Sequence, residues 1–164
     1  MTPRREREMV IREFLAGPPF GRRNVSDDEI AMFDTALTHD SYANEELSRG
    51  VKKNSYQRLE FLGDAVLELA VCEHIYSGTD IDQGGMTDFK KSKVCNDNIA
   101  LYVSEFGMNI DDTLLVGEGH KDKHGKNIVE DNMRADAFEA VLGAVYVLYG
   151  IDEAKRIVKE VILR

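Results

Sequence analysis

Hydrophobic residues recur along this chain at the three- and four-residue spacing of amphipathic helices. The first such segment covers residues 4–15 and contains Met9, Ile11 and Phe14 among its apolar positions. The same spacing predicts a helix that reaches about Thr38, a last helix at the C-terminus, and three long helices over residues 55–76, 87–106 and 128–149. Because helical periodicity dominates, the pattern predicts an all-α protein.

Strong helix breakers fall between the periodic segments rather than inside them. Gly17-Pro18-Pro19 ends the first helix, Gly84-Gly85 marks a break before the segment 87–106, and Gly107 ends that segment. Gly150 closes the apolar helix before it, and Asp152 is placed to cap the last helix. These breakers set the helix boundaries that we expect.

Two further segments lie outside the long helices. Ser26 and Glu29 have the spacing of a capping box, in which each side chain satisfies a free backbone N–H of the other residue. Residues 109–127 are rich in Asp, Gly, Lys and His, which predicts an exposed loop with a short helical turn. No repeat or linker divides the chain, so we expect residues 1–164 to form a single domain that includes a short basic helix within residues 1–20.

Composition narrows the class of protein. A chain of 164 residues with 43% hydrophobic and 31% charged residues is neither polar enough for disorder nor apolar enough for a membrane protein. Thirty acidic side chains against 21 basic ones give a formal net charge of −9. This acidity argues against a protein that holds phosphate backbones through a broad basic face.

The cysteines and the N-terminus bear on location. Cys72 and Cys95 fall in stretches that we expect to be buried and helical, without metal-ligand spacing, so neither a disulfide nor a zinc site is expected. The N-terminus lacks the apolar core of a signal peptide, and no stretch of about 18 apolar residues occurs. We expect a cytoplasmic protein with no membrane partner.

Two predicted helices carry acidic pairs beside their most apolar parts. Glu60 and Asp64 lie four residues apart, and Asp136 and Glu139 lie three apart, so each pair shares one helix face. Four converging carboxylates would need a cation, and oxygen ligands suit Mg²⁺ or Mn²⁺ better than zinc. A metal ion there would support phosphodiester hydrolysis. Each pair taken alone, however, is also typical of a solvated helix face.

Residues 54–67, NSYQRLEFLGDAVL, resemble the signature helix of the ribonuclease III family, the double-stranded RNA endonucleases. Three more segments resemble other motifs of that family in the same order: 36–45 (ALTHDSYANE), 85–94 (GMTDFKKSKV) and 135–146 (ADAFEAVLGAVY). The likeness covers nearly the whole chain. It implies an all-α ribonuclease III endonuclease fold that forms a homodimer.

The resemblance also implies a function. Glu60, Asp64, Asp136 and Glu139 would be the catalytic acids and the metal ligands, with Mg²⁺ as cofactor and Mn²⁺ as its substitute, and Glu139 would be a direct ligand. No small-molecule cofactor is implied. Double-stranded RNA would lie in a valley between the subunits and be cut to 5′-phosphate and 3′-hydroxyl ends with a two-nucleotide 3′ overhang. The expected role is processing of ribosomal and other structured RNA.

Three side chains bear on the details of this resemblance. Phe61 matches the residue that packs into a socket on the partner subunit. An ordinary core position fits its neighbours equally well, but its place between two of the candidate catalytic acids favours the dimer interface. Gln57 and Gln83 stand where many bacterial members carry Glu, so a further carboxylate pair is missing. We expect Gln57 to contact RNA. The chain ends about where the double-stranded RNA-binding domain of the family would begin.

Lysines are the candidates for phosphate contacts. Lys90, Lys91 and Lys93 follow the Gly85-Met86-Thr87 element, and helical spacing predicts at least two of them on a common exposed face. In the irregular loop we expect Lys121, Lys123 and Lys126 to meet phosphates. A lysine cluster is, however, usually a solvated face.

Other polar positions have simpler interpretations. His120 and His124 lack a third metal ligand, so we do not expect a metal site there. We expect His39 and Ser41 to make helix-end hydrogen bonds, with a general-base role for His39 as the alternative, and Arg58 to pair with a neighbouring carboxylate.

Gly63 and Gly143 lie within helices, where glycine is unfavourable, so we expect two helices to approach closely there.

Two rival functions remain from other classes. A catalytically silent ribonuclease-III-like scaffold would be expected to lack catalytic acids, whereas all four are present. An unrelated helical metal hydrolase acting on nucleotides would leave the motifs at residues 36–45 and 85–94 unexplained.

Overall fold

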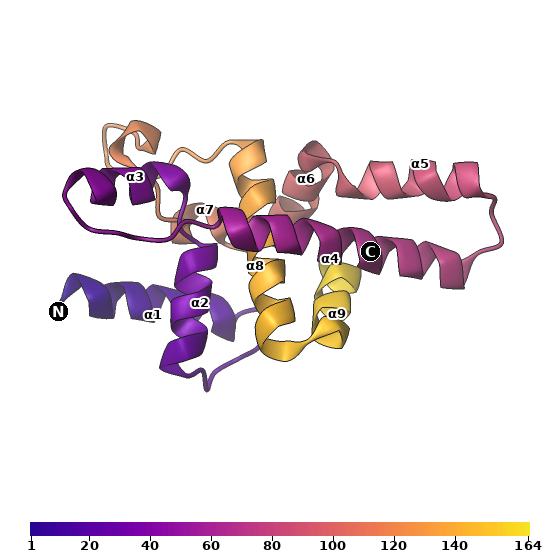
Figure 1. Cartoon of the computed structure of the whole chain (residues 1–164), viewed down its shortest axis with the longest axis horizontal. Coiled ribbons are helices and arrows are strands. Elements are labelled where there is room, and N and C mark those ends of the chain that lie inside the picture. The colour runs from indigo at the N-terminus through magenta and orange to yellow at the C-terminus, as the bar shows by residue number, and fades with distance from the viewer.

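The structure is a computed structural model that describes all 164 residues, and it contains nine α-helices (Figure 1). The elements are α1 (Pro3–Ala16), α2 (Asp27–Ala36), α3 (Asp40–Ser48), α4 (Gln57–Gly78), α5 (Gln83–Val94), α6 (Asn96–Phe106), α7 (Ile110–Thr113), the 3₁₀ turn η1 (Glu118–His120), α8 (Asp131–Tyr149) and α9 (Ile151–Val161). No β-strand forms beyond two isolated bridges. The predicted all-α class is confirmed. No helix is long and apolar enough to cross a membrane.

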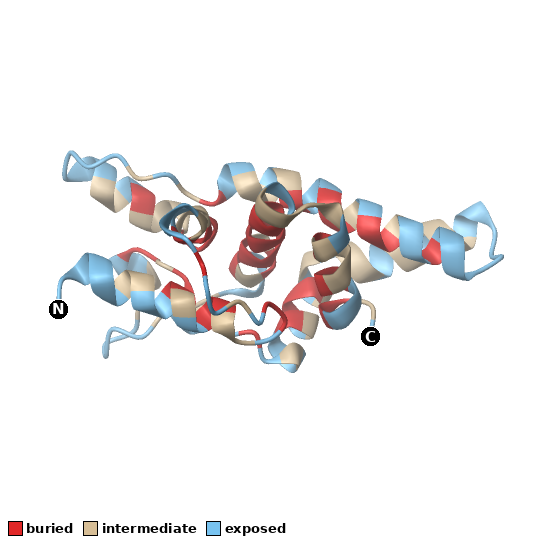
Figure 2. Ribbon diagram, turned by 90° about the horizontal axis from the view of Figure 1, so that it is seen from below, coloured by how far each residue is buried: buried red, intermediate tan, exposed pale blue.

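Helix α8 lies in the middle of the molecule, with α2, α4, α6 and α9 packed around it (Figure 1). Figure 2 shows the buried residues gathered along this helix, while the far end of the α4–α5 hairpin is largely exposed. From Ala135 to Val145 every residue except Asp136 is buried. Apart from Asp136 and Glu139, this stretch is apolar on all sides because neighbouring helices surround it.

The predicted helix ends at Ser26 and Gly107 are confirmed. The backbone N–H of Glu29 donates to Ser26 Oγ at 3.2 Å, and the Ser26 N–H donates to Glu29 Oε2 at 2.8 Å, which completes the capping box. Gly107 ends α6 at a φ of 83°, a left-handed conformation that glycine adopts without steric cost. Local sequence chemistry therefore determines both boundaries.

The predicted break at Gly84-Gly85 is wrong. Helix α5 begins at Gln83 and includes both glycines, because Asp82 caps its first turn by accepting a hydrogen bond from the Gly85 N–H at 2.8 Å. The break before α5 falls earlier, between Gly78 at the end of α4 and Gln83. The predicted single helix over residues 87–106 is also wrong, because the extended backbone of Cys95 divides it into α5 and α6. Cys95 is exposed and Cys72 is half-buried, so the expectation that both cysteines are buried is also wrong.

The predicted exposed loop over residues 109–127 is partly buried. It contains a short helix as expected, but Ile110 and Leu114 belong to the core. Leu115 pairs with the segment before α3, because the His39 N–H donates to the Leu115 carbonyl at 2.9 Å and the Leu115 N–H donates to the Leu37 carbonyl at 2.8 Å. The loop is thereby held beside α3, a helix that the hydrophobic pattern did not predict.

At the C-terminus, Asp152 does not cap the last helix as predicted. The cap position is occupied by Gly150, and Asp152 lies in the first turn of α9. An acidic side chain there still favours the helix, because it interacts with the positive end of the helix dipole.

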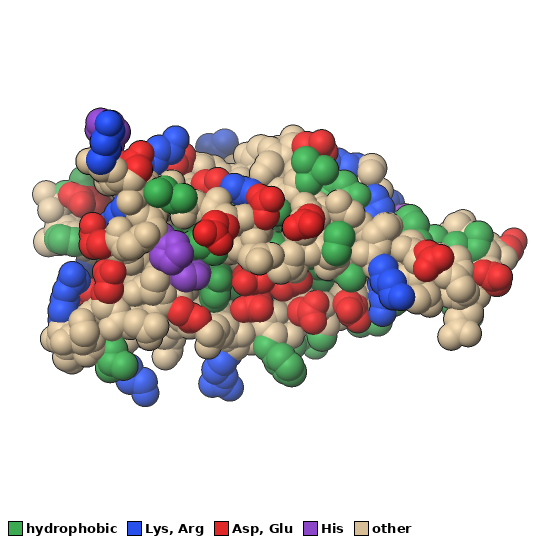
Figure 3. All heavy atoms as spheres, turned by 90° about the horizontal axis from the view of Figure 1, so that it is seen from above, with side chains coloured by type: hydrophobic (Ala, Val, Ile, Leu, Met, Phe, Trp, Pro, Cys, Tyr) green, Lys and Arg blue, Asp and Glu red, His purple; other side chains and the backbone are tan.

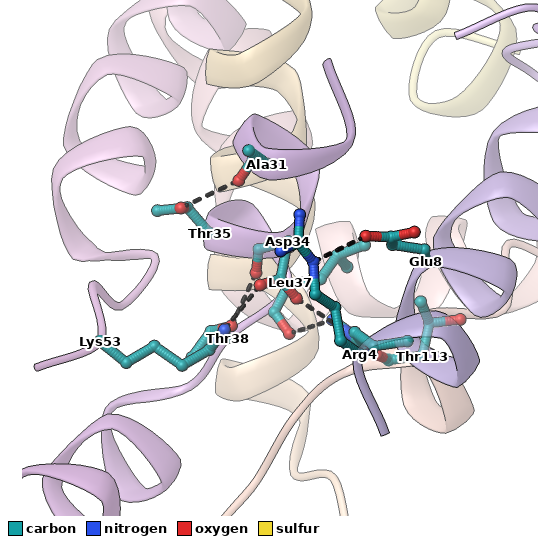
Figure 4. A network of polar contacts seen from close by, with 10 residues as sticks. Arg4, Glu8, Ala31, Asp34, Thr35, Leu37, Thr38, Lys53 and Thr113 are labelled. Carbon is teal, nitrogen blue, oxygen red and sulfur yellow. Dashed lines mark hydrogen bonds and ion pairs between the residues drawn. The ribbon is translucent and has the colours of Figure 1, made fainter. Parts of the chain in front are cut away.

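A polar network joins α1, α2 and the segment before α4 (Figure 4). Arg7 Nε donates to Asp34 Oδ1 at 2.7 Å, and Lys53 Nζ donates to Asp34 Oδ2 at 2.6 Å. Arg7 also donates to the Leu37 carbonyl at 3.1 Å. Burial alone would raise the pKa of Asp34, but the hydrogen bonds from Arg7 and Lys53 outweigh it and lower that pKa. The network therefore fixes the chain that leads into α3.

Candidate active site

Helices α4 and α8 meet in direct backbone contact at two glycines. A Cβ atom added to Gly63 would lie 1.6 Å from the carbonyl oxygen of Glu139, and one added to Gly143 would lie 2.3 Å from the carbonyl oxygen of Leu59. Atoms in protein interiors do not approach so closely, so a larger residue at either position would force the helices apart. The predicted close approach at these glycines is confirmed.

An acidic cluster lies beside this helix contact. Glu60 from α4 and Asp136 and Glu139 from α8 each offer a carboxylate oxygen, and these oxygens all lie within 4.8 Å of one another. Glu139 is only 5% exposed, while Glu60 and Asp136 are half-buried. Figure 3 shows acidic side chains gathered along the middle of one face of the molecule. Three of the four predicted acids, all except Asp64, thus come together between the two helices.

Asp64 lies outside this group of three. Its side chain is exposed, one helical turn after Glu60 on the same face of α4. Asp64 nevertheless acts on the cluster, because its negative charge contributes to raising the pKa values of Glu60 and Glu139. The structure therefore places Asp64 at the rim of the acidic cluster.

The cluster holds its negative charge without a cationic partner. No lysine or arginine forms an ion pair with Glu60, Asp136 or Glu139, although the structure contains 14 ion pairs elsewhere. Buried unpaired carboxylates are costly, so the arrangement fits a bound cation. The donor set consists only of oxygen atoms, which Mg²⁺ and Mn²⁺ accept and which zinc disfavours.

Burial and mutual repulsion shift the acids in the same direction. Burial, followed by the charges of Asp136, Asp40 and Asp64, raises the pKa of Glu60 to about 7. Burial, followed by the neighbouring acids, raises the pKa of Glu139 to about 8. Without a cation these carboxyl groups therefore hold protons near neutral pH, and a divalent ion would compete with those protons.

The two remaining acids are shifted less strongly. Burial and the charge of Glu68 raise the pKa of Asp64, while Lys90 opposes this shift. Burial also raises the pKa of Asp136, but a hydrogen bond from Asn96 opposes it.

The sequence interpretation missed two polar neighbours of the cluster. Asp40, the first residue of α3, accepts a hydrogen bond from the Gln57 amide, and Asn96 at the start of α6 supports Asp136. No spacing rule relates these residues to the acids, because they come from separate helices. The signal for Asp40 in the sequence is its position inside the segment 36–45, one of the motifs that resemble the ribonuclease III family.

The expected helix-end hydrogen bonds of His39 and Ser41 are confirmed. His39 occupies the cap position of α3, where its Nδ1 accepts the Ser41 N–H at 3.1 Å. The Ser41 Oγ in turn accepts the Gly117 N–H at 2.8 Å. Burial and the nearby His120 lower the pKa of His39. Both side chains therefore hold the loop against α3. His120 and His124 are not among the residues whose ligand atoms cluster closely enough to hold a metal ion.

The prediction that at least two lysines of α5 share one exposed face is wrong. Lys90 pairs with Glu68 at 3.6 Å, and the Lys93 ammonium lies 4.7 Å from the centre of the Tyr102 ring. Both side chains are half-buried, so Lys91 is the exposed member of the three. The physical reason is that the charges of Lys90 and Lys93 find partners within the protein.

The loop lysines lie in a turn closed by a bridge between Lys121 and Asn127. Lys121 pairs with Glu118 at 3.0 Å, whereas Lys123 and Lys126 are exposed. The structure thus leaves Lys123 and Lys126 available for contacts with another molecule.

Phe61 is 83% exposed, so its interpretation as an ordinary core residue is wrong. It lines a groove of about 1310 Å³ together with Met32, Leu47 and Leu62. Burying so large an apolar side chain is favourable, and a protein surface is the natural cover for it. Arg58 lines the same groove and forms no ion pair, so its expected carboxylate partner is not found.

The fold and the acidic cluster define an all-α protein with a candidate divalent-metal site. A family model described as Ribonuclease-III-like matches residues 29–164. The chain therefore belongs to the ribonuclease III family, as its sequence motifs indicated.

Curated relatives agree with this assignment. Ribonuclease 3 of Pelotomaculum thermopropionicum is 42% identical over 124 residues, which make up 75% of this chain and 49% of that protein. Ribonuclease 3 of Onion yellows phytoplasma is 33% identical over 146 residues, which make up 88% of this chain and 57% of that protein. The chain thus spans about half the length of the curated relatives it matches.

A solved structure supports the same conclusion. The nuclease domain of ribonuclease III from Campylobacter jejuni superposes with a TM-score of 0.70 at 26% sequence identity, over 93% of this chain and 94% of that one. That structure is described as flexible in a region involved in dimer formation. The chain therefore shares the fold of that nuclease domain over nearly its whole length.

Proposed function

We propose that this chain is the nuclease domain of a divalent-metal-dependent endoribonuclease that hydrolyses phosphodiester bonds of double-stranded RNA. The observation that carries the proposal is the cluster of Glu60, Asp136 and Glu139, whose carboxylate oxygens converge without a lysine or arginine partner. Membership of the ribonuclease III family supports the substrate class.

Each acid has a distinct place in the proposed site. Glu139 is the most buried and would be a direct ligand, and Glu60 and Asp136 complete the set of three. Asp64 at the rim would supply the fourth carboxylate for the metal. When bound, Mg²⁺ or Mn²⁺ would supply an activated water and offset the charge that develops on the phosphate. The Asn96 side chain would orient Asp136.

The exposed Phe61 supports a homodimer in which each subunit inserts this ring into the groove of the other. Two sites would then face opposite strands, and each would leave a 5′-phosphate and a 3′-hydroxyl, with a two-nucleotide 3′ overhang. Lys91, Lys123 and Lys126 are the exposed candidates for phosphate contacts. The biological substrates we propose are ribosomal and other structured RNA precursors.

Cleavage of a long duplex RNA by the purified chain, in Mg²⁺ or in EDTA, tests the proposal. Glu139→Gln keeps the side-chain shape but removes the charge, and we expect it to lower the cleavage rate by more than about 100-fold. Glu130→Gln is the matched control, because Glu130 is exposed and makes no side-chain cap at the start of α8.

The outcomes separate the proposal from its rivals. Metal-dependent cutting that survives Glu139→Gln would contradict the assignment of the site. Duplex binding without cutting by the wild type would favour a silent scaffold. Hydrolysis of the phosphate groups of mononucleotides in preference to duplex RNA would favour an unrelated nucleotide hydrolase.

A further inference from the structure

Asp40 and Gln57 form a polar pair at the edge of the acidic cluster, and metal binding does not account for either residue. Asp40 begins α3 and Gln57 begins α4. The Tyr56 N–H donates to the Thr38 carbonyl at 2.9 Å, which holds the starts of the two helices side by side. Gln57 also precedes Glu60 by one helical turn, so the pair lies beside a member of the cluster.

The pairing with Asp40 fixes the orientation of the Gln57 amide. A carboxylate can only accept hydrogen bonds, so the amide nitrogen Nε2 must face Asp40, as observed. The carbonyl oxygen Oε1 then points away from Asp40. Gln57 is exposed, and no protein group donates to this oxygen. The structure therefore presents a hydrogen-bond acceptor of fixed orientation next to the acidic cluster.

The acceptor character of Oε1 selects the kind of group that Gln57 can bind. An ionised phosphodiester carries no hydrogen atom, so its oxygens cannot donate to this acceptor. A hydroxyl or amine donor is favoured instead. Duplex RNA offers a ribose 2′-hydroxyl at every nucleotide, and these hydroxyls line its wide, shallow minor groove.

We propose that Gln57 is a specificity-determining residue that accepts a hydrogen bond from a ribose 2′-hydroxyl near the scissile phosphate, and that Asp40 is the positioning residue that holds its amide in the accepting orientation. The inference rests on the proposed function, since it requires that duplex RNA reach the cluster. It accounts for both members of the pair: Gln57 contacts the ribose, and Asp40 acts only through Gln57.

A cycle of substitutions in protein and RNA tests this contact. Duplex RNAs with a single 2′-deoxy nucleotide at successive positions around the mapped cleavage site are compared by kcat/KM in Mg²⁺. We expect one position at which the deoxy substitution slows the wild type by roughly fivefold to tenfold, the value of one hydrogen bond. Gln57→Leu slows cleavage of the all-ribose duplex by the same factor, and the two changes together cost no more than either alone.

Two further variants separate positioning from stability. Asp40→Asn frees the amide of Gln57 to turn, so the dependence on that 2′-hydroxyl weakens. The double variant Asp40→Asn with Gln57→Glu exchanges donor and acceptor, keeps the net charge and leaves an acceptor at position 57, so the dependence returns. Asn24→Leu is the control, because Asn24 is exposed, makes no side-chain hydrogen bond and lies outside the groove that Gln57 and Phe61 line; it leaves the dependence unchanged.

Each contrary outcome identifies what fails. If the wild type cuts duplex RNA but the effects of Gln57→Leu and of every deoxy substitution multiply independently, the ribose contact is refuted and the proposed function stands. If Gln57→Leu instead abolishes sensitivity to replacing guanosine by inosine, the acceptor binds a base amine and the inference is wrong. If the wild type cuts no duplex RNA, the proposed function fails first.

Discussion

Replacing Gly63 by alanine tests whether backbone contact between α4 and α8 builds the acidic site. The added Cβ would lie 1.6 Å from the carbonyl oxygen of Glu139. Ordinary contact requires a separation of roughly 3.5 Å, so the two helices must move apart by about 2 Å. Overpacking of this kind lowers the free energy of unfolding by about 1–3 kcal/mol. We expect a loss of about 3 kcal/mol here, because the opposing atom belongs to the backbone and cannot move aside as a side chain would. Because the displaced residue is Glu139 itself, metal binding should weaken together with stability.

Urea denaturation and Mn²⁺ titration monitored by electron paramagnetic resonance measure the two effects. Gly78→Ala is the matched control, because Gly78 ends the same helix and nothing lies within 4 Å of an added Cβ there. We expect the control to leave Mn²⁺ affinity unchanged and stability equal or higher by up to about 1 kcal/mol. A Gly63→Ala protein with wild-type stability and Mn²⁺ affinity would refute the reasoning.

Three further predictions concern charge and assembly. In EDTA, the raised pKa of Glu139 means that the folded protein retains a proton that the unfolded chain loses above about pH 4.5, so the free energy of unfolding falls as the pH rises from there to about 8. Glu139→Gln should make this pH dependence less steep when the free energy of unfolding is measured by urea denaturation. An unchanged pH dependence would contradict the prediction. Asp34→Asn should destabilise the fold by about 2–3 kcal/mol at pH 7, because Arg7 and Lys53 lose their shared partner; since the pKa of Asp34 is lowered, this difference should shrink as the pH falls below about 3.8, and a difference independent of pH would count against the network. Phe61→Asp should yield monomers by sedimentation equilibrium, because the exposed ring would become a charge that a partner groove rejects; a dimer of wild-type affinity would exclude Phe61 from the interface.

The long helices were predictable because their signals are local. The capping box at Ser26 and the left-handed Gly107 act within one turn, and the apolar run before Gly150 needs only a partner on each side. The break at Cys95 was not predictable in the same way. It depends on where α6 packs against α8, and the glycines at the start of α5 gave a stronger but misleading local signal.

The acidic site was predictable as two pairs but not as a cluster of three. Spacing placed Glu60 and Asp136 on favourable helix faces, whereas the relative rotation of α4 and α8 determines which oxygens meet. The lysines show the same limit. Spacing cannot reveal that Lys90 faces Glu68 or that Lys93 covers Tyr102, because those partners lie on other helices. The exposure of Phe61, by contrast, agrees with the partner-facing position that the family resemblance implied.

The hydrogen bonds around residues 37–41 also bear on how the chain acquires its structure during synthesis. The Leu37 carbonyl accepts a hydrogen bond from Arg7, which lies 30 residues earlier in the chain. The Ser41 Oγ accepts one from the Gly117 N–H, which lies 76 residues later. Contacts of such long separation form late, because a long loop must close before they stabilise anything. A chain emerging from the ribosome can therefore form α1 and α2 early. The position of Asp40 at the edge of the acidic cluster, however, is not fixed until Gly117 has emerged and bonded to Ser41. The exchange rate of the Gly117 amide hydrogen would report that closure.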